Sequence, residues 1–244
     1  MPTMTDWIIA AGTIVMAVVA VIAIFQDKIR AWLLRPILKV SISVAPPDSH
    51  KTKYHFTTEQ WITSGSSPVY SETGKIEISR ETDAYYFRLR IENSGNHKAE
   101  SVEVFATELS RRQADGLFKV VDSFLPMNLA WSHVHWIFFP AISPDTYKHC
   151  DLAHIINPQM RSAIQLEDST WPNISPEKTI LSFDTIVKPY TKNFLVPPGT
   201  YRLVISVAAA NSKPVNKTLE ITLTGDWYDD EQKMLGEGIG IRML

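Results

Sequence analysis

The chain has 244 residues, of which 45% are hydrophobic and 20% charged, and its formal net charge is −2 at pH 7. This composition provides enough apolar material for a folded core, and the near-neutral charge gives no reason to expect nucleic acid as a partner. The single cysteine, Cys150, excludes an intramolecular disulfide and every zinc or redox motif built on paired cysteines.

An uncharged apolar run from Trp7 to Phe25 lies near the start of the chain. At a helical rise of about 1.5 Å per residue, this run spans about 30 Å, which is the thickness of the hydrocarbon core of a bilayer. We therefore predict a single transmembrane helix that contacts the lipid bilayer through residues 7–25. A cleaved signal peptide is the alternative, but basic residues before the run and small residues at a cleavage site after it are both missing.

Basic residues follow the apolar run, and none precedes it. Because Lys and Arg near a membrane segment tend to stay on the cytoplasmic side, we predict a protein of the plasma or inner membrane with a cytoplasmic C-terminal domain. The same segment could form a short interfacial helix that recognises anionic lipid, but a continuation of the membrane helix that ends near Pro36 is the preferred interpretation. The predicted membrane-interface residues are Lys28, Arg30, Trp32, Arg35 and Lys39.

From Leu38 onward the apolar period changes from that of a helix to the period of two that is typical of half-buried strands. The segments with this alternation are 38–44, 85–91, 102–104, 201–207 and 219–223, with shorter candidates at 118–121, 132–138 and 180–183. Turn residues separate them at Asn93-Ser94-Gly95-Asn96 and at Pro197-Pro198-Gly199. No long amphipathic helix lies between them, so the pattern predicts a mainly β fold in which antiparallel strands form a β-sandwich.

The predicted organisation is an anchor at residues 1–40 followed by one β-sandwich domain at residues 41–244. Two stretches exceed the usual size of such a sandwich: about 45–82, which is rich in Ser, Thr and Pro, and about 124–178, which carries Pro, His and Trp with weaker periodicity. We interpret both as insertions. A second small domain at 124–178 is the alternative.

The segment FRLRIENSGNHKAESVEVFA resembles the paired strands and N-x-G turn of bacterial immunoglobulin-like, adhesion-type sandwich domains. VPPGTYRLVISVAAANSK is similar to their penultimate strand, with Tyr201 at the place of a tyrosine corner. This resemblance implies an immunoglobulin-like β-sandwich and, by analogy of fold alone, a binding or structural role. The cysteine pair of antibody domains is absent, so the resemblance is to the disulfide-free branch.

The C-terminal tail is predicted to contain one or two helical turns with Asp226 as N-cap and Gly236 as the stop. Asp226, Asp229 and Asp230 are close enough in sequence to suggest a cation site or an acidic docking surface. Their spacing lacks the ligand order and glycine of a calcium loop, so a solvated helix is the preferred interpretation.

One group of residues could carry chemistry. On a strand, His133 and His135 would point to the same face, and three further side chains could complete a tetrahedral zinc set. The spacing matches no established zinc motif, and a thiolate nucleophile would need an electropositive, partly exposed setting. The five residues of this group are His133, His135, His149, Cys150 and His154.

The aromatic residues can be interpreted either as core residues or as a surface that binds a partner. Trp61, Trp131, Trp136, Trp171 and Trp227, with Phe138-Phe139-Pro140, could form an exposed recognition patch. Most are expected to pack in the core, so loop tips such as 64–68 or a sheet edge are the expected binding surfaces.

The sequence therefore favours a non-catalytic protein without a cofactor, which binds or positions a protein partner at the membrane. A membrane-tethered zinc- or thiol-dependent hydrolase centred on the His and Cys group is one alternative. An outward-facing structural or adhesive module, with the opposite membrane orientation, is the other.

Overall fold

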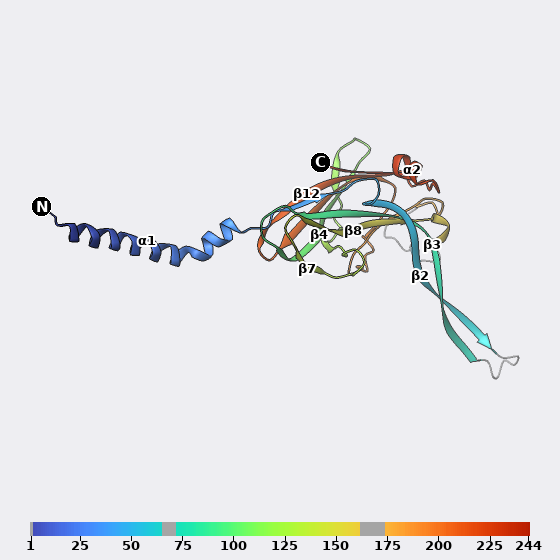
Figure 1. The fold of residues 1–244 in the computed structure, drawn as a ribbon. Helices are drawn as coiled ribbons and strands as arrows, with labels where there is room; N and C mark the ends of the chain where they lie inside the picture. The colour runs from blue at the N-terminus through green and yellow to red at the C-terminus, as the bar shows by residue number, and fades with distance from the viewer. Residues whose placement is uncertain (1, 65–71, 162–173) are drawn as a thin grey trace.

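The computed structural model describes residues 2–64, 72–161 and 174–244, without the side chains of residues 27–33 and 58–77. The chain begins with a 30-residue helix, α1 (Met4–Leu33). Its stretch Met4–Gln26 is long and apolar enough to cross a membrane, and no other part of the described chain buries it. A signal sequence near the N-terminus would have the same character. Figure 1 shows α1 projecting from one end of the folded body.

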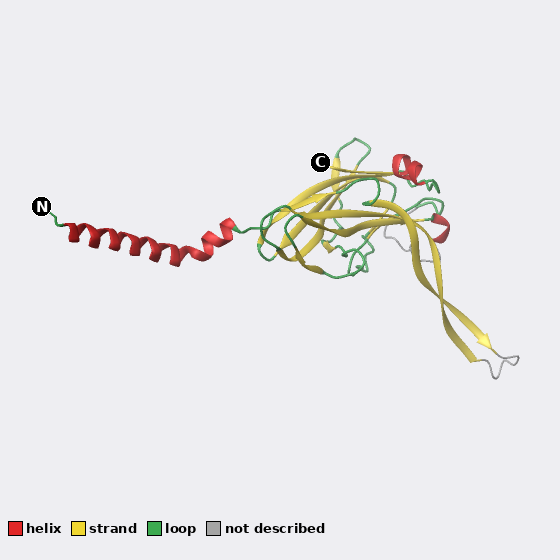
Figure 2. Cartoon of the chain, viewed as in Figure 1, coloured by secondary structure: helices red, strands yellow, loops and turns green. Residues whose placement is uncertain are grey.

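The folded body consists of two antiparallel sheets, as Figure 2 shows. In the described residues the first sheet has six strands in the order β1-β3-β8-β9-β10, with β2 also pairing with β3. Its strands are β1 (Leu38–Ser41), β2 (Ser49–Ser64), β3 (Glu72–Asn93), β8 (Thr146–Ile156), β9 (Leu181–Phe183) and β10 (Leu195–Val196).

The second sheet has seven strands in the described part of the chain, in the order β13-β12-β11-β4-β5, with β6 and β7 also pairing with β4. Its strands are β4 (Ala99–Arg112), β5 (Phe118–Val120), β6 (Met127–Asn128), β7 (Phe138–Ile142), β11 (Gly199–Ala209), β12 (Ser212–Leu223) and β13 (Ile239–Met243). The predicted mainly β sandwich is confirmed.

The core lies between the inner faces of the two sheets. Every second residue of the middle of β3 is buried, from Tyr85 to Ile91, and the same alternation runs along β4 and β11. This is what a period of two produces when one face of each strand packs against the other sheet. Tyr201 is also buried, and its hydroxyl donates to the carbonyl of Pro197 at 2.9 Å.

Strands β2 and β3 form a hairpin that extends beyond the body, at the end opposite α1 (Figure 1). β3 pairs with β8 only from Ala84 onward, so in the described residues the outer part of the hairpin has two strands alone. Residues 45–82, predicted as an insertion, therefore include most of a long strand pair that the sequence analysis did not predict. This strand pair was missed although Tyr54 and Phe56 alternate with Lys53, His55 and Thr57 on β2.

The strand predicted at 132–138 is wrong. Residues 132–134 form a turn in which His133 has φ 69°, His135 follows with φ 50°, and β7 begins only at Phe138. The shorter candidates at 118–121 and 180–183 are confirmed as β5 and β9.

The C-terminal tail also differs from its prediction. The N-cap of the short helix α2 (Glu231–Lys233) is Asp230, which accepts the Lys233 N–H at 2.7 Å, whereas Asp226 pairs with Lys178. A π-helical turn, η2 (Met234–Gly238), follows, so Gly236 does not stop the helix. The tail then returns to the sheet as β13, which the sequence analysis missed. A 3-10 turn, η1 (Pro158–Met160), follows β8.

The turn between β3 and β4 holds the segment that leaves α1. Asn96 Oδ1 accepts the Arg35 N–H at 3.0 Å, and Asn93 Oδ1 accepts the Ile37 N–H at 3.1 Å. The Ser94 N–H donates to the Ile37 carbonyl at 2.8 Å. We call this turn, residues 93–96, the exit turn, because it attaches the end of the helix to the sandwich.

Candidate functional site

An apolar hollow lies where three segments meet at one side of the sandwich. The segment from Met127 to Ala130 runs between the two sheets: Leu129 N–H donates to the Val104 carbonyl of β4 at 2.8 Å, and Ala130 N–H donates to the Asp184 carbonyl at 2.8 Å. The segment after β9 follows it, because Ile186 N–H donates to the Asn128 carbonyl at 3.1 Å. These bonds fix the backbone that forms the hollow.

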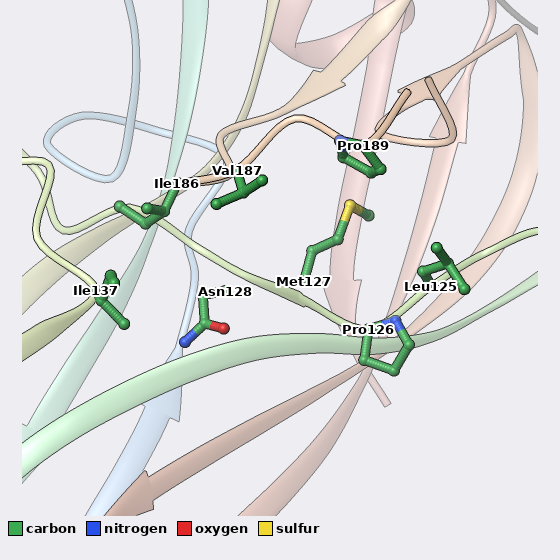
Figure 3. Close-up of a pocket in the computed structure, with 8 residues that line it drawn as sticks. All are labelled: Leu125, Pro126, Met127, Asn128, Ile137, Ile186, Val187 and Pro189. Atoms are coloured by element: carbon green, nitrogen blue, oxygen red, sulfur yellow. The ribbon is translucent and has the colours of Figure 1, made fainter. Parts of the chain in front are cut away.

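The hollow has a volume of about 210 Å³ and mostly apolar walls. Figure 3 shows the side chains around it, with Met127 between Asn128 and Pro189. Met127 is buried, whereas Val187 is 73% exposed. The residues that line the hollow are Leu125, Pro126, Met127, Asn128, Ile137, Ile186, Val187 and Pro189.

Further apolar side chains are exposed next to the lining residues in sequence. Trp136 and Phe138 flank Ile137, and each is about half exposed. Tyr190, next to Pro189, is fully exposed. Single exposed apolar residues are ordinary, but a group of them around a hollow is typical of an interaction site.

Two polar groups belong to this site. The Asn128 side-chain amide lines the hollow and makes no hydrogen bond within the described part of the chain. Lys188 lies between two lining residues, is exposed, and has its Nζ 5.6 Å from the ring centroid of Phe194. No carboxylate of the described residues pairs with Lys188. The site thus offers an amide in its apolar lining and an exposed lysine between two lining residues in sequence.

The structure separates the five residues of the predicted metal or thiol group. His133 and His135 are exposed in the turn before β7, so they do not form the strand pair that a metal site would require. His149 Nε2 lies 3.0 Å from Asp48 Oδ1, and His154 Nδ1 lies 2.7 Å from Asp184 Oδ1. Across the described residues, no group of three or more His, Cys, Asp or Glu side chains could hold a metal ion.

Cys150 is fully buried in the core, and its Sγ donates to the Ala130 carbonyl at 3.3 Å. Burial raises the pKa of its thiol well above the ordinary value, and the carboxylates of Asp151 and Asp184 raise it further. A nucleophilic cysteine needs the opposite setting, an exposed thiolate near positive charge. Cys150 therefore acts as a small core residue.

The charged residues on the outer face of the first sheet form buried ion pairs. Asp151 Oδ1 accepts from Arg88 Nε at 2.9 Å and from Ser132 Oγ at 2.6 Å. His154 stacks against Tyr54 and Tyr86, with ring centroids 4.9 and 5.2 Å apart. The contacts of Asp151 give its buried carboxylate and the Arg88 guanidinium each a partner, which explains why this pair of charges is tolerated.

The predicted membrane-interface residues divide into two groups. The side chains of Lys28, Arg30 and Trp32 lie outside the described residues. Arg35 and Lys39 are exposed, the first at the exit turn and the second on β1. Loop 64–68, predicted as a binding loop, lies outside the described residues except for Ser64.

The predicted aromatic patch is also divided. Trp131 is fully buried and Trp227 is partly buried, as expected for core residues, whereas Trp136 and Phe138, on either side of the lining residue Ile137 in sequence, are exposed. The side chains of Trp61 and Trp171 lie outside the described residues. The sequence signal for the hollow was the run Trp136-Ile137-Phe138, but its partners at 124–128 and 186–190 could not be found without the fold.

No protein-family model and no curated protein sequence matches this chain.

Proposed function

We propose that the protein is a single-pass membrane protein whose immunoglobulin-like sandwich binds or positions a protein partner at the membrane, without catalysing a reaction. The observation that carries this proposal is the apolar hollow, whose lining residues Leu125, Ile137 and Val187 are at least half exposed. Exposed Trp136, Phe138 and Tyr190 are next to lining residues in sequence. Aromatic side chains around an apolar depression are enriched at protein interfaces.

Two further features support the membrane part of the proposal. The length and composition of α1 suit a membrane span, and the described chain provides no other cover for it. The exit turn fixes the helix end to β1 and β3, so the sandwich would be held close to the bilayer. The basic residues after the helix favour a cytoplasmic sandwich.

The immunoglobulin-like assignment is supported by Tyr201. Its hydroxyl bonds to the carbonyl of Pro197, four residues upstream, which is the geometry of a tyrosine corner. The paired sheets of antiparallel strands are compatible with the same architecture.

Co-purification and crosslinking of the full-length protein from its native membrane test the proposal. We expect a reproducible protein partner that is lost in Ile137→Glu, because a charge in the hollow opposes apolar contact. Leu117→Glu is the matched control, since Leu117 is also exposed but lies in the turn between β4 and β5. Equal recovery of the partner with both variants, or no partner at all, would contradict the proposal.

Membrane orientation is tested separately. A cysteine introduced at exposed Lys213 should react with an impermeant thiol reagent only after the cells are permeabilised. Cys150 does not interfere because it is buried. Labelling in intact cells would instead support the outward-facing structural or adhesive module.

A further inference from the structure

We infer that the hollow receives one or two apolar side chains from an extended segment of another protein, and that this segment carries an acidic residue beside them. This inference rests on the proposed function and specifies the chemistry of the partner. Three features of the hollow lead to it: its size, the amide of Asn128 and the charge of Lys188.

The size of the hollow favours side chains over a free small molecule. Its volume is about 210 Å³, whereas cofactor and drug-sized ligands occupy pockets of about 300–1,000 Å³. A protein cavity of about 150 Å³ is known to take a benzene molecule. The hollow therefore has room for one aromatic or branched aliphatic side chain, or for two small ones.

The Asn128 amide favours a peptide over a lipid chain. This amide has one donor group and one acceptor group at the wall of the hollow, and neither is used within the described residues. An acyl chain covering the amide would leave both groups without partners, which is costly. The backbone of an extended peptide offers a carbonyl and an N–H that can satisfy both.

The positive charge of Lys188 favours a partner segment that carries a negative charge. Lys188 lies in sequence between the lining residues Val187 and Pro189 and is exposed. Its ammonium group lies 5.6 Å from the Phe194 ring centroid and has no carboxylate partner among the described residues. A partner segment with Asp or Glu next to its apolar residue would supply that carboxylate and would be guided to the site.

A second copy of this chain fits less well. In a two-fold symmetric contact centred on the hollow, one hollow would face another with no side chain to fill either. The two copies of Lys188 would also approach each other and repel. The favoured occupant is therefore a different protein.

The first experiment places the photoreactive residue p-benzoylphenylalanine at Val187 of the full-length protein in its native membrane. Val187 lines the hollow and is exposed, so the substitution should not disturb folding. Mass spectrometry of the crosslinked peptides should identify an apolar residue of another protein with Asp or Glu within about three positions, the reach of neighbouring residues in an extended chain. Lipid adducts, crosslinks to a second copy, or a segment without an acidic residue would overturn the inference.

The second experiment uses a synthetic peptide with the crosslinked sequence and full-length protein in detergent. Lys188→Glu should weaken binding of the peptide about fivefold at low salt, and by a smaller factor at high salt. Asn128→Ala should weaken binding of the peptide by about threefold. A peptide with its acidic residue changed to Lys should bind Lys188→Glu better than the original peptide does. Lys213→Glu, an exposed charge reversal on β12, should have no effect. Equal binding of the peptide to the wild type and to Lys188→Glu would overturn the charge assignment.

The two proposals fail in different ways. If a partner co-purifies but never crosslinks from position 187, this inference is wrong while the proposed function stands. If no protein partner is recovered from the native membrane, both are wrong.

Discussion

The side-chain oxygen of Asn93 accepts the backbone N–H of Ile37 at 3.1 Å, and this bond joins the start of the sandwich to the turn between β3 and β4. Asn93 is fully buried, and its Nδ2 group donates to the carbonyls of His97 and Ile142 at 2.7 and 3.0 Å. The Asn93 side chain thus connects the segment after α1, the residues that follow the exit turn and the end of β7. The attachment of the helix to the body depends on this turn.

Gly95→Ala should loosen that attachment. A methyl group at Gly95 would lie 2.8 Å from the carbonyl carbon of Pro36, and closer still to backbone atoms of Arg35 and Ile37. Because backbone cannot move aside as a flexible side chain can, we expect a loss of about 1–3 kcal/mol in the free energy of unfolding. Limited proteolysis should cut more rapidly between α1 and β1.

Gly240→Ala is the control for this variant, because a methyl group at Gly240 would meet no atom within 4 Å. Similar unfolding free energies and cleavage rates for the two variants would show that the exit turn does not hold the helix end.

Asp151→Ala should be strongly destabilising. It removes the acceptor of Arg88 and Ser132 and leaves a largely buried guanidinium without its partner, which typically costs about 3–5 kcal/mol. Urea unfolding measures the change. The double variant Arg88→Met with Asp151→Leu should recover a large part of the loss, because no charge is then left buried.

The exposed pair of Lys98 and Glu100 is the matched comparison, with side chains 55% and 42% exposed. Glu100→Ala should change the free energy of unfolding by less than about 1 kcal/mol. If Asp151→Ala is equally mild, the Arg88–Asp151 pair does not stabilise the sheet.

Alkaline pH should destabilise the sandwich between about pH 10 and 12. Burial raises the pKa of Tyr201 to about 12, and burial together with nearby carboxylates raises the pKa of Tyr85 to about 12. The unfolded chain releases these protons near pH 10 while the folded chain keeps them, so the stabilisation is complete below pH 10 and is lost as pH rises toward 12. We expect a decrease of roughly 2–3 kcal/mol from Tyr201 over that range, and a smaller one from Tyr85, because solvent screens the nearby carboxylates.

Urea unfolding at several pH values, with tyrosinate absorbance as a second readout, checks this dependence. Tyr201→Phe should cost about 1 kcal/mol at pH 7, because the bond to Pro197 is lost, and should reduce the alkaline slope. Tyr190→Phe should change neither quantity, since Tyr190 is fully exposed. An unchanged alkaline slope in Tyr201→Phe would contradict the assignment of the loss of stability at high pH to the Tyr201 hydroxyl.

Cys150 should not react with aromatic disulfide reagents while the protein is folded. Its thiol is buried, and its raised pKa keeps it protonated at neutral pH. Adding urea above the unfolding midpoint should make it react fully, which provides the positive control. Rapid reaction of Cys150 with these reagents in the native protein would contradict this prediction and would support the thiol-dependent hydrolase alternative.

Local patterns in the sequence were sufficient to predict the long apolar helix, the alternating strands from Tyr85 to Ile91 and from Tyr201 to Val207, and the turn at residues 93–96. Each depends on residues close together in the chain: an uninterrupted apolar run, a period of two, or a glycine between polar turn formers. These signals need no knowledge of what packs against them.

The tertiary structure decided everything that depends on pairing between distant segments. The pairing of β2 with β3 was not predicted, although the alternation from Tyr85 to Ile91 of β3 was, and His133 and His135 lie in a turn although their spacing suits a strand. The hollow unites residues 125–128, 137, 186, 187 and 189, which the pairing of β6 with β4 and of Asn128 with Ile186 brings together. A one-dimensional pattern determines which face of an element is apolar, but contacts between elements determine which apolar residues stay exposed.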